Sequence, residues 1–552
     1  MKTRSPYLAI LALCANLAIA ASAHADDLML RIRQTAVGAA PQYEVLHAQS
    51  GSFAHQPPLA EQREGDLLLI GRDAQGAELF RRSVRSPTEH NNESFDPHTG
   101  AIVAAHKSTG AAGVVEVRMP YPKALQSIDL LPQHVGAPGA AALANPAPTR
   151  RLLRQELDAL LAAPPQASAA PAAGGKLKMG AALAPAAKAA IVPTGSAMLW
   201  QTGPSNSRMD IVLIGDGYAA ADQAKWRSDA QTVVNGILAD PLFYSYRGFL
   251  NIRRVDIVSP DSGVSENFGA IARNTALGTV VGCYGLDRLV CADPNLVVNA
   301  VAAVAPVDGR DLTVLVANSV TYGGSGAPTF AALTMHPQSI QIALHEIGHT
   351  AFQLADEYDV GTCATTTEPS EADVTIQTQR ASVKWNGLIG ASTPVPTQAG
   401  VYANGTVGLF VGGKYCPNSV YRPTENSRMR TLGQPWHAVN ERRADGVFRF
   451  YDPGVTIYGS LNGVGAIAYQ PGAAVNSAAG GAFTLTVWGP TNSQFDLMLL
   501  KWNGSAYAVV AQNTDSTSAK TVSYQGTAGY YLVEIRARVG SGAYTLNYNF
   551  PN

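Results

Sequence analysis

The sequence predicts a multidomain protein in which an α/β segment lies between two segments built from β-strands. Residues 26–135 and 456–552 contain short stretches where apolar and polar residues alternate, whereas residues 196–455 combine continuous apolar runs with helix-like stretches. Strands alternating with helices are typical of a sheet covered by helices, and repeated strands without helices are typical of β-sandwiches. At 552 residues, the chain is also too long for one ordinary domain.

The first 25 residues have the pattern of a secretory signal peptide. Lys2 and Arg4 precede an apolar run over residues 7–20, and small residues suited to cleavage follow at 21–25. The apolar run is shorter than the roughly 20 residues that a membrane-spanning helix needs. We therefore expect residues 1–25 to be removed and the protein to be secreted, either to the periplasm or out of the cell.

The N-terminal segment, residues 26–135, is expected to form an antiparallel, sandwich-like β domain because its apolar alternation is punctuated by Gly, Pro and Asp. No cluster of catalytic residue types stands out there. His90, His98 and His106 are spaced too irregularly to be proposed as metal ligands. Residues 136–195 are dominated by Ala and Pro and are expected to be mainly a linker, with one amphipathic helix over 150–161.

The central segment, residues 196–455, contains apolar runs that predict buried strands at 210–218, 250–258 and 313–318. A helix is expected over residues 221–239. The alternation returns after residue 455 without helical patterns, so residues 456–552 are expected to form an all-β sandwich domain.

Four cysteines remain once the signal peptide is removed. An even number in an oxidising compartment favours two disulfides over free buried thiols. Cys283 with Cys291 would close a short loop, and Cys363 with Cys416 a longer one.

The run His345-Glu346-Ile347-Gly348-His349 carries the clearest chemistry in the chain. On a helix, residues four apart lie about 40° apart around the axis, so both imidazoles can face one ion. Glu346 is then placed to take a proton from a water molecule that zinc has made more acidic. The apolar residues 340–344 favour a buried helix over a chance match on an exposed one.

A third protein ligand is needed to complete a zinc site of this kind. Asp356 is favoured over Glu357, with its neighbour as support for the ligand. Seven further helical residues would carry Asp356 about 10 Å along the axis from His349, too far to share an ion. If Asp356 is the ligand, the helix must end near Gln353 and the chain must turn back. A glycine is usual three residues after the second histidine, but Phe352 occupies that position. Glu368 or Glu371 as a more distant ligand is the less favoured alternative.

The central segment resembles the secreted bacterial IgA-peptidase-type metallopeptidases over roughly residues 196–455. The resemblance is carried by Asp210-Ile211-Val212-Leu213-Ile214-Gly215-Asp216-Gly217-Tyr218, Ser259-Pro260-Asp261-Ser262-Gly263, the zinc motif with Leu354-Ala355-Asp356-Glu357-Tyr358, Tyr421-Arg422-Pro423 and Ser427-Arg428-Met429. It implies a metzincin-like, zinc-dependent endopeptidase that binds one Zn²⁺ through His345, His349 and a carboxylate from Asp356 or Glu357, with Glu346 as general base.

The resemblance also makes Met429 a candidate for a methionine turn beneath the metal. Tyr358, Tyr421 and His437 are candidates for stabilising the oxyanion, although a structural role is favoured for each. The last segment resembles the small β domains appended to many secreted bacterial peptidases, through Phe495-Asp496-Leu497, Lys501-Trp502-Asn503-Gly504 and residues 540–546. An inhibitory propeptide precedes the catalytic domain in many secreted proteases. That role is less favoured here, because the linker has no cysteine to bind the zinc.

The expected substrates are proteins or peptides, with immunoglobulins and other extracellular glycoproteins among the candidates. The formal net charge of −1 gives no reason to expect nucleic acid as a partner, and no later segment is long and apolar enough for stable membrane insertion. Two other functions compete: a zinc hydrolase acting on a non-peptide amide, and an adhesin or glycan-binding protein with a degenerate peptidase core. Oligomeric state does not follow from the sequence.

Overall fold

The protein is multidomain, with many β-sheets and few helices. The computed structural model describes residues 27–37, 40–51, 53, 65–110, 112–133, 148–163, 191–326, 329–360, 363, 367–451, 454–490, 493–516 and 519–551. The expected signal peptide and most of the expected linker lie outside these residues. No helix within the described ranges has the length and apolar character required to cross a membrane.

Two sheets near the N-terminus pack face to face and share one apolar core. The first has the order β2-β1-β7 and the second β4-β3-β8-β9. Their strands are β1 (Asp27–Val37), β2 (Ala40–Gly51), β3 (Leu67–Arg72), β4 (Glu78–Val84), β7 (Ala112–Pro120), β8 (Ser127–Pro132) and β9 (Arg150–Leu153). Leu30 and Val117 from one sheet meet Leu69 and Leu130 from the other, and all four are fully buried. We call these two sheets the N-terminal unit.

The N-terminal unit extends into the segment that the sequence predicts to be a linker. Strand β9 pairs with β8, and helix α1 (Arg154–Ala162) follows it directly. The helix predicted over 150–161 is thus present from residue 154, whereas residues 150–153 form a strand. Leu157 of α1 belongs to the core of the unit. The predicted linker of residues 136–195 therefore contains a strand and a helix that complete the preceding sheet.

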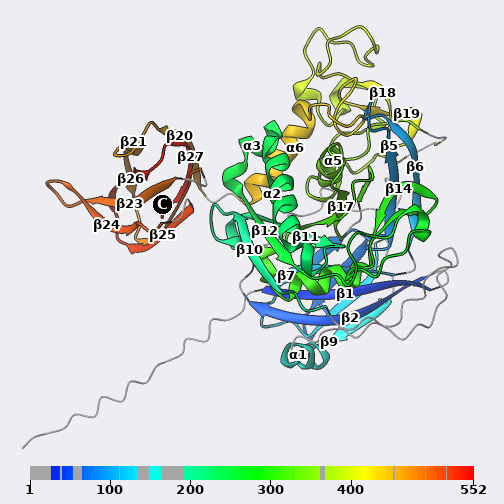
Figure 1. Ribbon diagram of the computed structural model, residues 1–552, viewed down its shortest axis with the longest axis horizontal. Helices are drawn as coiled ribbons and strands as arrows, with labels where there is room; N and C mark the ends of the chain where they lie inside the picture. Colours follow the sequence, from blue (N-terminus) through cyan, green and yellow to red (C-terminus); the bar gives the residue numbers. More distant parts are fainter. Residues whose placement is uncertain are drawn as a thin grey trace, which may run out of the picture.

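A hairpin formed by β5 (Glu89–Phe95) and β6 (Ile102–Thr109) is a separate two-stranded sheet within the same part of the sequence. In Figure 1 these blue strands rise away from β1 and β2, and β5 lies beside β14 of the central segment. The residues between the two strands also pair with a distant segment, because Ala101 forms a β-bridge with Thr431.

The central segment is built on an eight-stranded mixed sheet with the order β10-β12-β11-β15-β17-β16-β14-β13. Its strands are β10 (Gly195–Trp200), β11 (Met209–Asp216), β12 (Leu250–Asp256), β13 (Val280–Cys283), β14 (Leu286–Cys291), β15 (Leu312–Ala317), β16 (Gly324–Gly326) and β17 (Ala331–Thr334). Three of these strands match the predicted apolar runs. All eight residues of β11 are buried, as expected for a strand covered on both faces.

Helices cover both faces of this sheet. Ile211 and Leu213 of β11 belong to a core shared with α2 (Gln223–Ala239), α3 (Pro241–Ser245), α5 (Ser339–Thr350) and α6 (His437–Phe450). Val212 and Ile214 point to the opposite core, which includes α4 (Pro294–Ala302). A short hairpin of β18 (Phe410–Gly413) and β19 (Cys416–Arg422) lies in the later part of the segment.

The last part of the chain forms two four-stranded antiparallel sheets around one core. Their orders are β20-β27-β22-β25 and β21-β26-β23-β24. The strands are β20 (Val455–Leu461), β21 (Ile467–Ser477), β22 (Gly481–Trp488), β23 (Gln494–Trp502), β24 (Tyr507–Asn513), β25 (Ala519–Gly526), β26 (Gly529–Val539) and β27 (Gly542–Asn549). This sandwich stands to one side in Figure 1 and touches the central segment where Trp488 packs against Trp200, with tilted rings whose centroids are 3.6 Å apart.

Two disulfides are present, with the pairings that the sequence predicts. Cys283 and Cys291 join β13 to β14 across their hairpin, and Cys363 is joined to Cys416 at the start of β19. The second bridge ties the chain that follows the zinc motif to the β18–β19 hairpin.

Candidate active site

Helix α5 carries the His-Glu-x-x-His run and is buried around most of its circumference. Every residue from Ile342 to Gly348 is buried. Ala343, Leu344 and Ile347 pack into the core beneath the central sheet, so the helix is fixed by apolar contacts on that side. The opposite side holds the polar groups of His345 and Glu346, which can lie there only if they find partners.

Both histidines are oriented by backbone carbonyls. His345 Nδ1–H donates to the carbonyl oxygen of Arg428 (3.0 Å), and His349 Nδ1–H donates to that of Leu354 (2.8 Å). A carbonyl can only accept, so each neutral imidazole carries its proton on Nδ1 and presents the lone pair of Nε2. The two Nε2 atoms lie 3.1 Å apart. Histidines that bind a metal through Nε2 are commonly oriented in this way by hydrogen bonds at their other ring nitrogen.

The chain turns back immediately after α5. The helix ends at Thr350, and Gln353 adopts a positive φ of 56°. The amide of Leu354 then donates to the carbonyl oxygen of Gly348 (3.0 Å). The residue with left-handed backbone conformation is therefore Gln353, one position after Phe352, which occupies the place where a glycine is usual. The turn brings the following residues back toward the histidines.

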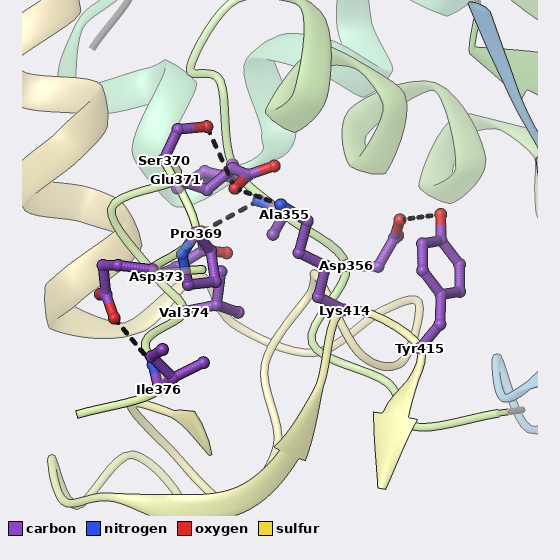
Figure 2. Close-up of polar contacts among 12 residues, drawn as sticks. Ala355, Asp356, Pro369, Ser370, Glu371, Asp373, Val374, Ile376, Lys414 and Tyr415 are labelled. Atoms are coloured by element: carbon purple, nitrogen blue, oxygen red, sulfur yellow. Dashed lines mark hydrogen bonds and ion pairs between the residues drawn. The ribbon is translucent and has the colours of Figure 1, made fainter. Parts of the chain in front are cut away.

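Asp356 reaches the histidines as a result of this turn. Its Oδ1 lies 3.2 Å from His345 Nε2 and 3.1 Å from His349 Nε2. Its Oδ2 accepts a hydrogen bond of 2.6 Å from the hydroxyl of Tyr415, a residue that the sequence interpretation missed. Figure 2 shows this contact between the Asp356 side chain and the tyrosine at the tip of the β18–β19 hairpin.

A loop over residues 367–376 supports Asp356 from behind. Asp373 Oδ1 accepts a hydrogen bond from the amide of Ala355 (2.9 Å), and the amide of Lys414 donates to the carbonyl oxygen of Asp356 (2.7 Å). Lys414 also forms an ion pair of 2.8 Å with Glu371 in this loop (Figure 2). Glu368 accepts from the hydroxyl of Thr375. Glu368 and Glu371, the weaker candidates for a ligand, are thus engaged in holding the loop.

The fourth member of the group is Glu93, from strand β5. Its Oε2 lies 3.2 Å from His345 Nε2, and ligand atoms of Glu93, His345, His349 and Asp356 all lie within 4.8 Å of one another. We call these four residues the metal cluster. The sequence shows no cluster of catalytic residue types in residues 26–135, yet the structure brings Glu93 of this segment beside His345. A single acidic residue so far in sequence from the two histidines forms no recognisable motif with them. Its position beside them becomes apparent only from the way the β5–β6 hairpin packs against the central segment.

The metal cluster has the donor set of a zinc site. In a tetrahedral site with bonds of about 2.0–2.1 Å, neighbouring ligand atoms are about 3.3 Å apart, close to the separations among the histidine nitrogens and Asp356 Oδ1. Within the described residues, no hydrogen-bond partner is found for the buried Oδ1 of Asp356. Burial disfavours a charged His349, but the carboxylate of Asp356 outweighs this effect and raises the pKa of His349 to about 9. Acceptor atoms and negative charge converge on a point that a cation would stabilise.

Glu346 lies beside the cluster rather than in it. A side chain at Gly326 of β16 would collide with Glu346 Oε2, because a Cβ there would be 1.8 Å from that atom. Burial and the nearby Glu93 carboxylate raise the pKa of Glu346 to about 8. The absence of a side chain at residue 326 thus makes room for the glutamate.

Glu357 and Met429 lie behind the cluster. Glu357 is fully buried, and its Oε1 accepts a hydrogen bond from Asn440 Nδ2 of α6 (3.0 Å). Burial raises the pKa of Glu357 to about 7, although its hydrogen bonds oppose the shift. Met429 is fully buried beneath α5, and a Cβ at Gly348 would lie 2.6 Å from its sulfur. Gly348 therefore allows the methionine to approach the helix between its two histidines.

The three remaining candidates occupy different positions. Tyr358 is buried with its ring 5.3 Å from that of Tyr415, and burial together with the charges of Asp356 and Glu93 raises its pKa well above the usual value. Tyr421 pairs through its backbone with Thr375 and packs beside the apolar cluster around Trp385. His437 begins α6 with its ring against Gly405. No described interaction brings Tyr421 or His437 to the metal cluster.

Comparison with known structures gives short matches. The chain resembles the Yersinia pseudotuberculosis-derived mitogen over 18% of its own length and 86% of the mitogen (16% identity, TM-score 0.15). It resembles the pre-peptidase C-terminal domain of a collagenase from Bacillus anthracis over 17% and 89% of the two chains (17% identity, TM-score 0.14). A similar match covers 17% of this chain and 85% of PliG from Aeromonas hydrophila, a periplasmic inhibitor of g-type lysozyme (14% identity, TM-score 0.13).

Comparison with protein families gives a match to the part of the chain that carries the site. Residues 197–403 match the family described as IgA Peptidase M64, and this range includes His345, Glu346, His349 and Asp356. Glu93, Tyr415 and Met429 lie outside it. The family resemblance drawn from the sequence motifs is thereby confirmed for the central part of the chain, which matches the IgA Peptidase M64 family.

Proposed function

We propose that this protein is a zinc-dependent endopeptidase whose metal is held by His345, His349 and Asp356. The observation that carries the proposal is the convergence of two Nε2 lone pairs and one unpartnered carboxylate oxygen at separations of 3.1 to 3.2 Å. The peptidase family match over residues 197–403 supports the class of reaction.

Zinc supplies Lewis acidity in such a site: it polarises the scissile carbonyl and makes a water molecule a better nucleophile near neutral pH. Glu346 takes the proton from the attacking water and delivers it to the nitrogen of the leaving amine. The carbonyl oxygens of Arg428 and Leu354 hold the two imidazoles so that both Nε2 atoms face the reaction centre. Tyr415 holds Asp356 in place, and Tyr358, whose ring lies 5.3 Å from that of Tyr415, is a candidate donor to the developing oxyanion.

We further propose a metzincin-like arrangement for residues 196–455, with Met429 as the methionine beneath the metal site. Residues 1–25 are proposed as a cleaved signal peptide and residues 456–552 as an accessory β-sandwich domain. Proteins are the proposed substrates, with immunoglobulins and other extracellular glycoproteins as the first to test. Secretion is supported by the two disulfides.

The test is hydrolysis of casein by the full-length protein together with a count of bound zinc. We expect one zinc per chain, a rate abolished by a chelator and restored by zinc, and a loss of about 10³-fold or more in Glu346→Gln with the zinc retained. Glu89→Gln, an equivalent change at an exposed position, serves as the control and should leave both measurements unchanged. Equal rates in the wild type and Glu346→Gln would contradict the proposal.

A further inference from the structure

Glu93 belongs to a part of the chain that has no place in the family match. It lies on β5, about a hundred residues before the matched range begins at 197, yet its carboxylate is 3.2 Å from His345 Nε2. Its side chain is 2% exposed. The hydroxyl of Tyr415 is within hydrogen-bond distance of both Glu93 (3.3 Å) and Asp356 (2.6 Å), so the two carboxylates share one donor.

Three protein ligands are enough for a catalytic zinc, because such sites keep a fourth position open for water or substrate. A fourth protein ligand, here the carboxylate of Glu93, converts the set into the closed type that is typical of structural zinc sites. The burial of the site agrees with closure on the side of His345, which is fully buried, and of Glu346 and Asp356, which are each 3% exposed, while the His349 side chain keeps 15% exposure. A polypeptide substrate therefore reaches Glu346 only in the fraction of molecules in which these groups are uncovered, and the wild type hydrolyses casein slowly.

The cover is the β5–β6 hairpin, and it is docked by specific contacts. Glu93 and Phe95 lie on either side of a register shift in the strand, and both side chains contact His345. The ring of Phe95 meets that of His345 edge-on at 5.0 Å. Phe95 also shares a small apolar core with Ile102 of β6 and with Tyr322, Ile342 and Leu432 of the central segment.

Polar contacts fix the hairpin at two further points. Arg288 Nη1 donates to the carbonyl oxygen of Phe95 (2.8 Å), and the amide of Leu432 donates to that of Gly100 (2.9 Å). Both donors come from the central segment and both acceptors from the hairpin. The contact is thus a folded interface, with Glu93 at its buried centre.

We propose that the β5–β6 hairpin is an inhibitory element that keeps the peptidase latent by placing Glu93 in the open coordination position. This inference rests on the proposed function, because it assigns Glu93 as the fourth ligand of the same metal. Activation then requires the hairpin to leave the site, which exposes Glu346 and frees the fourth position. The inhibitory group is therefore a carboxylate from the N-terminal β domain, and not a cysteine from the linker as considered for an inhibitory propeptide.

The test uses the full-length protein with cobalt(II) in place of zinc, because the visible spectrum of cobalt reports its ligands without any assay of activity. The probe is acetohydroxamate, a small chelating ligand that needs an accessible coordination position. We expect Glu93→Gln to bind the probe at least about tenfold more tightly than the wild type, as loss of one metal-site interaction commonly shifts affinity by about 10- to 100-fold. Glu89→Gln, on the same strand but exposed, should behave as the wild type does.

Arg288→Ala provides a second variant in which the cluster is intact. Removing the guanidinium loosens the hairpin at Phe95, so probe binding should again be tighter than in the wild type, by a smaller factor than in Glu93→Gln. This variant decides the question even if Glu93→Gln does not fold. Casein hydrolysis should rise in the same order, with wild type lowest and Glu93→Gln highest.

Two results would overturn the proposal. Equal probe binding by the wild type, Glu93→Gln and Arg288→Ala would mean that the fourth position is already open. Loss of cobalt from a folded Glu93→Gln would mean that Glu93 is an essential structural ligand. Failure of the proposed function looks different: spectra that respond to the probe as expected, with no hydrolysis by any variant, would leave Glu93 as the closing ligand of a site that is not a peptidase.

Discussion

At the scale of single residues, the geometry of the metal cluster depends on the hydrogen bonds that its members make with the surrounding chain. Asp356 has one oxygen facing the two histidines and the other held by the hydroxyl of Tyr415 at 2.6 Å. A carboxylate fixed on one side can present the other in one direction. The hydroxyl of Tyr415 is thus expected to act through Asp356 and not on the substrate.

We expect Tyr415→Phe to lower zinc affinity by about 10- to 100-fold, because it leaves a buried carboxylate oxygen without its donor. Competition with a chelating dye measures the change directly. Tyr469→Phe removes a hydroxyl from a half-exposed tyrosine in the C-terminal sandwich and should have no effect. Unchanged affinity in Tyr415→Phe would show that the ligand is fixed by other contacts.

Gln353 is the second residue on which the site depends, because its positive φ turns the chain after α5. Glycine adopts this conformation at little cost, whereas a β-branched residue is strained there. Both substitutions remove the hydrogen bond that Gln353 Oε1 accepts from Arg443, so comparing them isolates the backbone. We expect Gln353→Val to be less stable than Gln353→Gly by about 1–3 kcal/mol and to bind zinc more weakly, measured by thermal unfolding and dye competition. Equal stability of the two variants would contradict the role given to this turn.

At the scale of elements, the loop over residues 367–376 is organised by one lysine. Lys384 Nζ donates to the carbonyl oxygens of Pro369, Glu371 and Val374 and forms an ion pair of 3.2 Å with Glu368. An ammonium group surrounded by carbonyl oxygens fixes a loop that contains no regular helix or strand. The loop in turn holds Ala355, next to Asp356, through Asp373.

We expect Lys384→Met to destabilise the protein by about 1–3 kcal/mol, since three partly buried carbonyl oxygens lose their donor. Zinc affinity should fall as well, because the support behind Asp356 is weakened. Lys225→Met, at an exposed ion pair on α2, is the matched change and should cost no more than about 0.5 kcal/mol. Thermal unfolding and zinc titration of both variants check this prediction, which fails if they are equally stable.

The elements that the sequence predicts well are those with strong local patterns. The apolar run at 210–218 and the helix expected at 221–239 correspond to β11 and α2 with ends shifted by about two residues, as usual for element boundaries. The need for a turn near Gln353 followed from helix geometry once Asp356 was taken as the ligand. Glu93 could not be found in this way. Its neighbours form an ordinary strand, and its partners lie some 250 residues away, so its role depends on docking between segments that no local pattern encodes.

At the scale of the whole molecule, the N-terminal unit is joined to the central segment by buried ion pairs. The carboxylate of Glu116 on β7 forms an ion pair of 2.9 Å with Arg31 of its own sheet and one of 2.6 Å with Arg310 of the central segment. Arg118, two residues along β7, pairs with Asp311 at 2.9 Å, and both side chains are almost fully buried. These contacts hold in place the unit from which the β5–β6 hairpin extends.

The pKa of Glu116 makes this junction dependent on pH. Burial opposes its ionised form, but the charges and hydrogen bonds of Arg310 and Arg31 outweigh burial and lower its pKa to about 2. Because the folded-state pKa lies below the unfolded value of about 4.5, the native state binds fewer protons than the unfolded state between these values. The stabilisation, about 3 kcal/mol by linkage, is therefore present above about pH 4.5 and is lost as the pH falls toward 2.

We accordingly expect Glu116→Gln to be destabilised by about 3–5 kcal/mol at pH 7, because two arginines lose their buried partner. The difference in unfolding free energy between this variant and the wild type should shrink as the pH falls to 3 and below. Thermal unfolding across this range measures it. Glu44→Gln, which breaks the exposed pair with Arg33, should cost less than about 1 kcal/mol at either pH. A difference in stability that is the same at pH 7 and pH 3 would contradict the ionised role of Glu116.

If the junction also holds the inhibitory hairpin in place, cobalt-substituted Glu116→Gln should bind acetohydroxamate more tightly than the wild type at pH 7. Unchanged probe binding would show that the hairpin is held by its own contacts with Arg288 and Leu432.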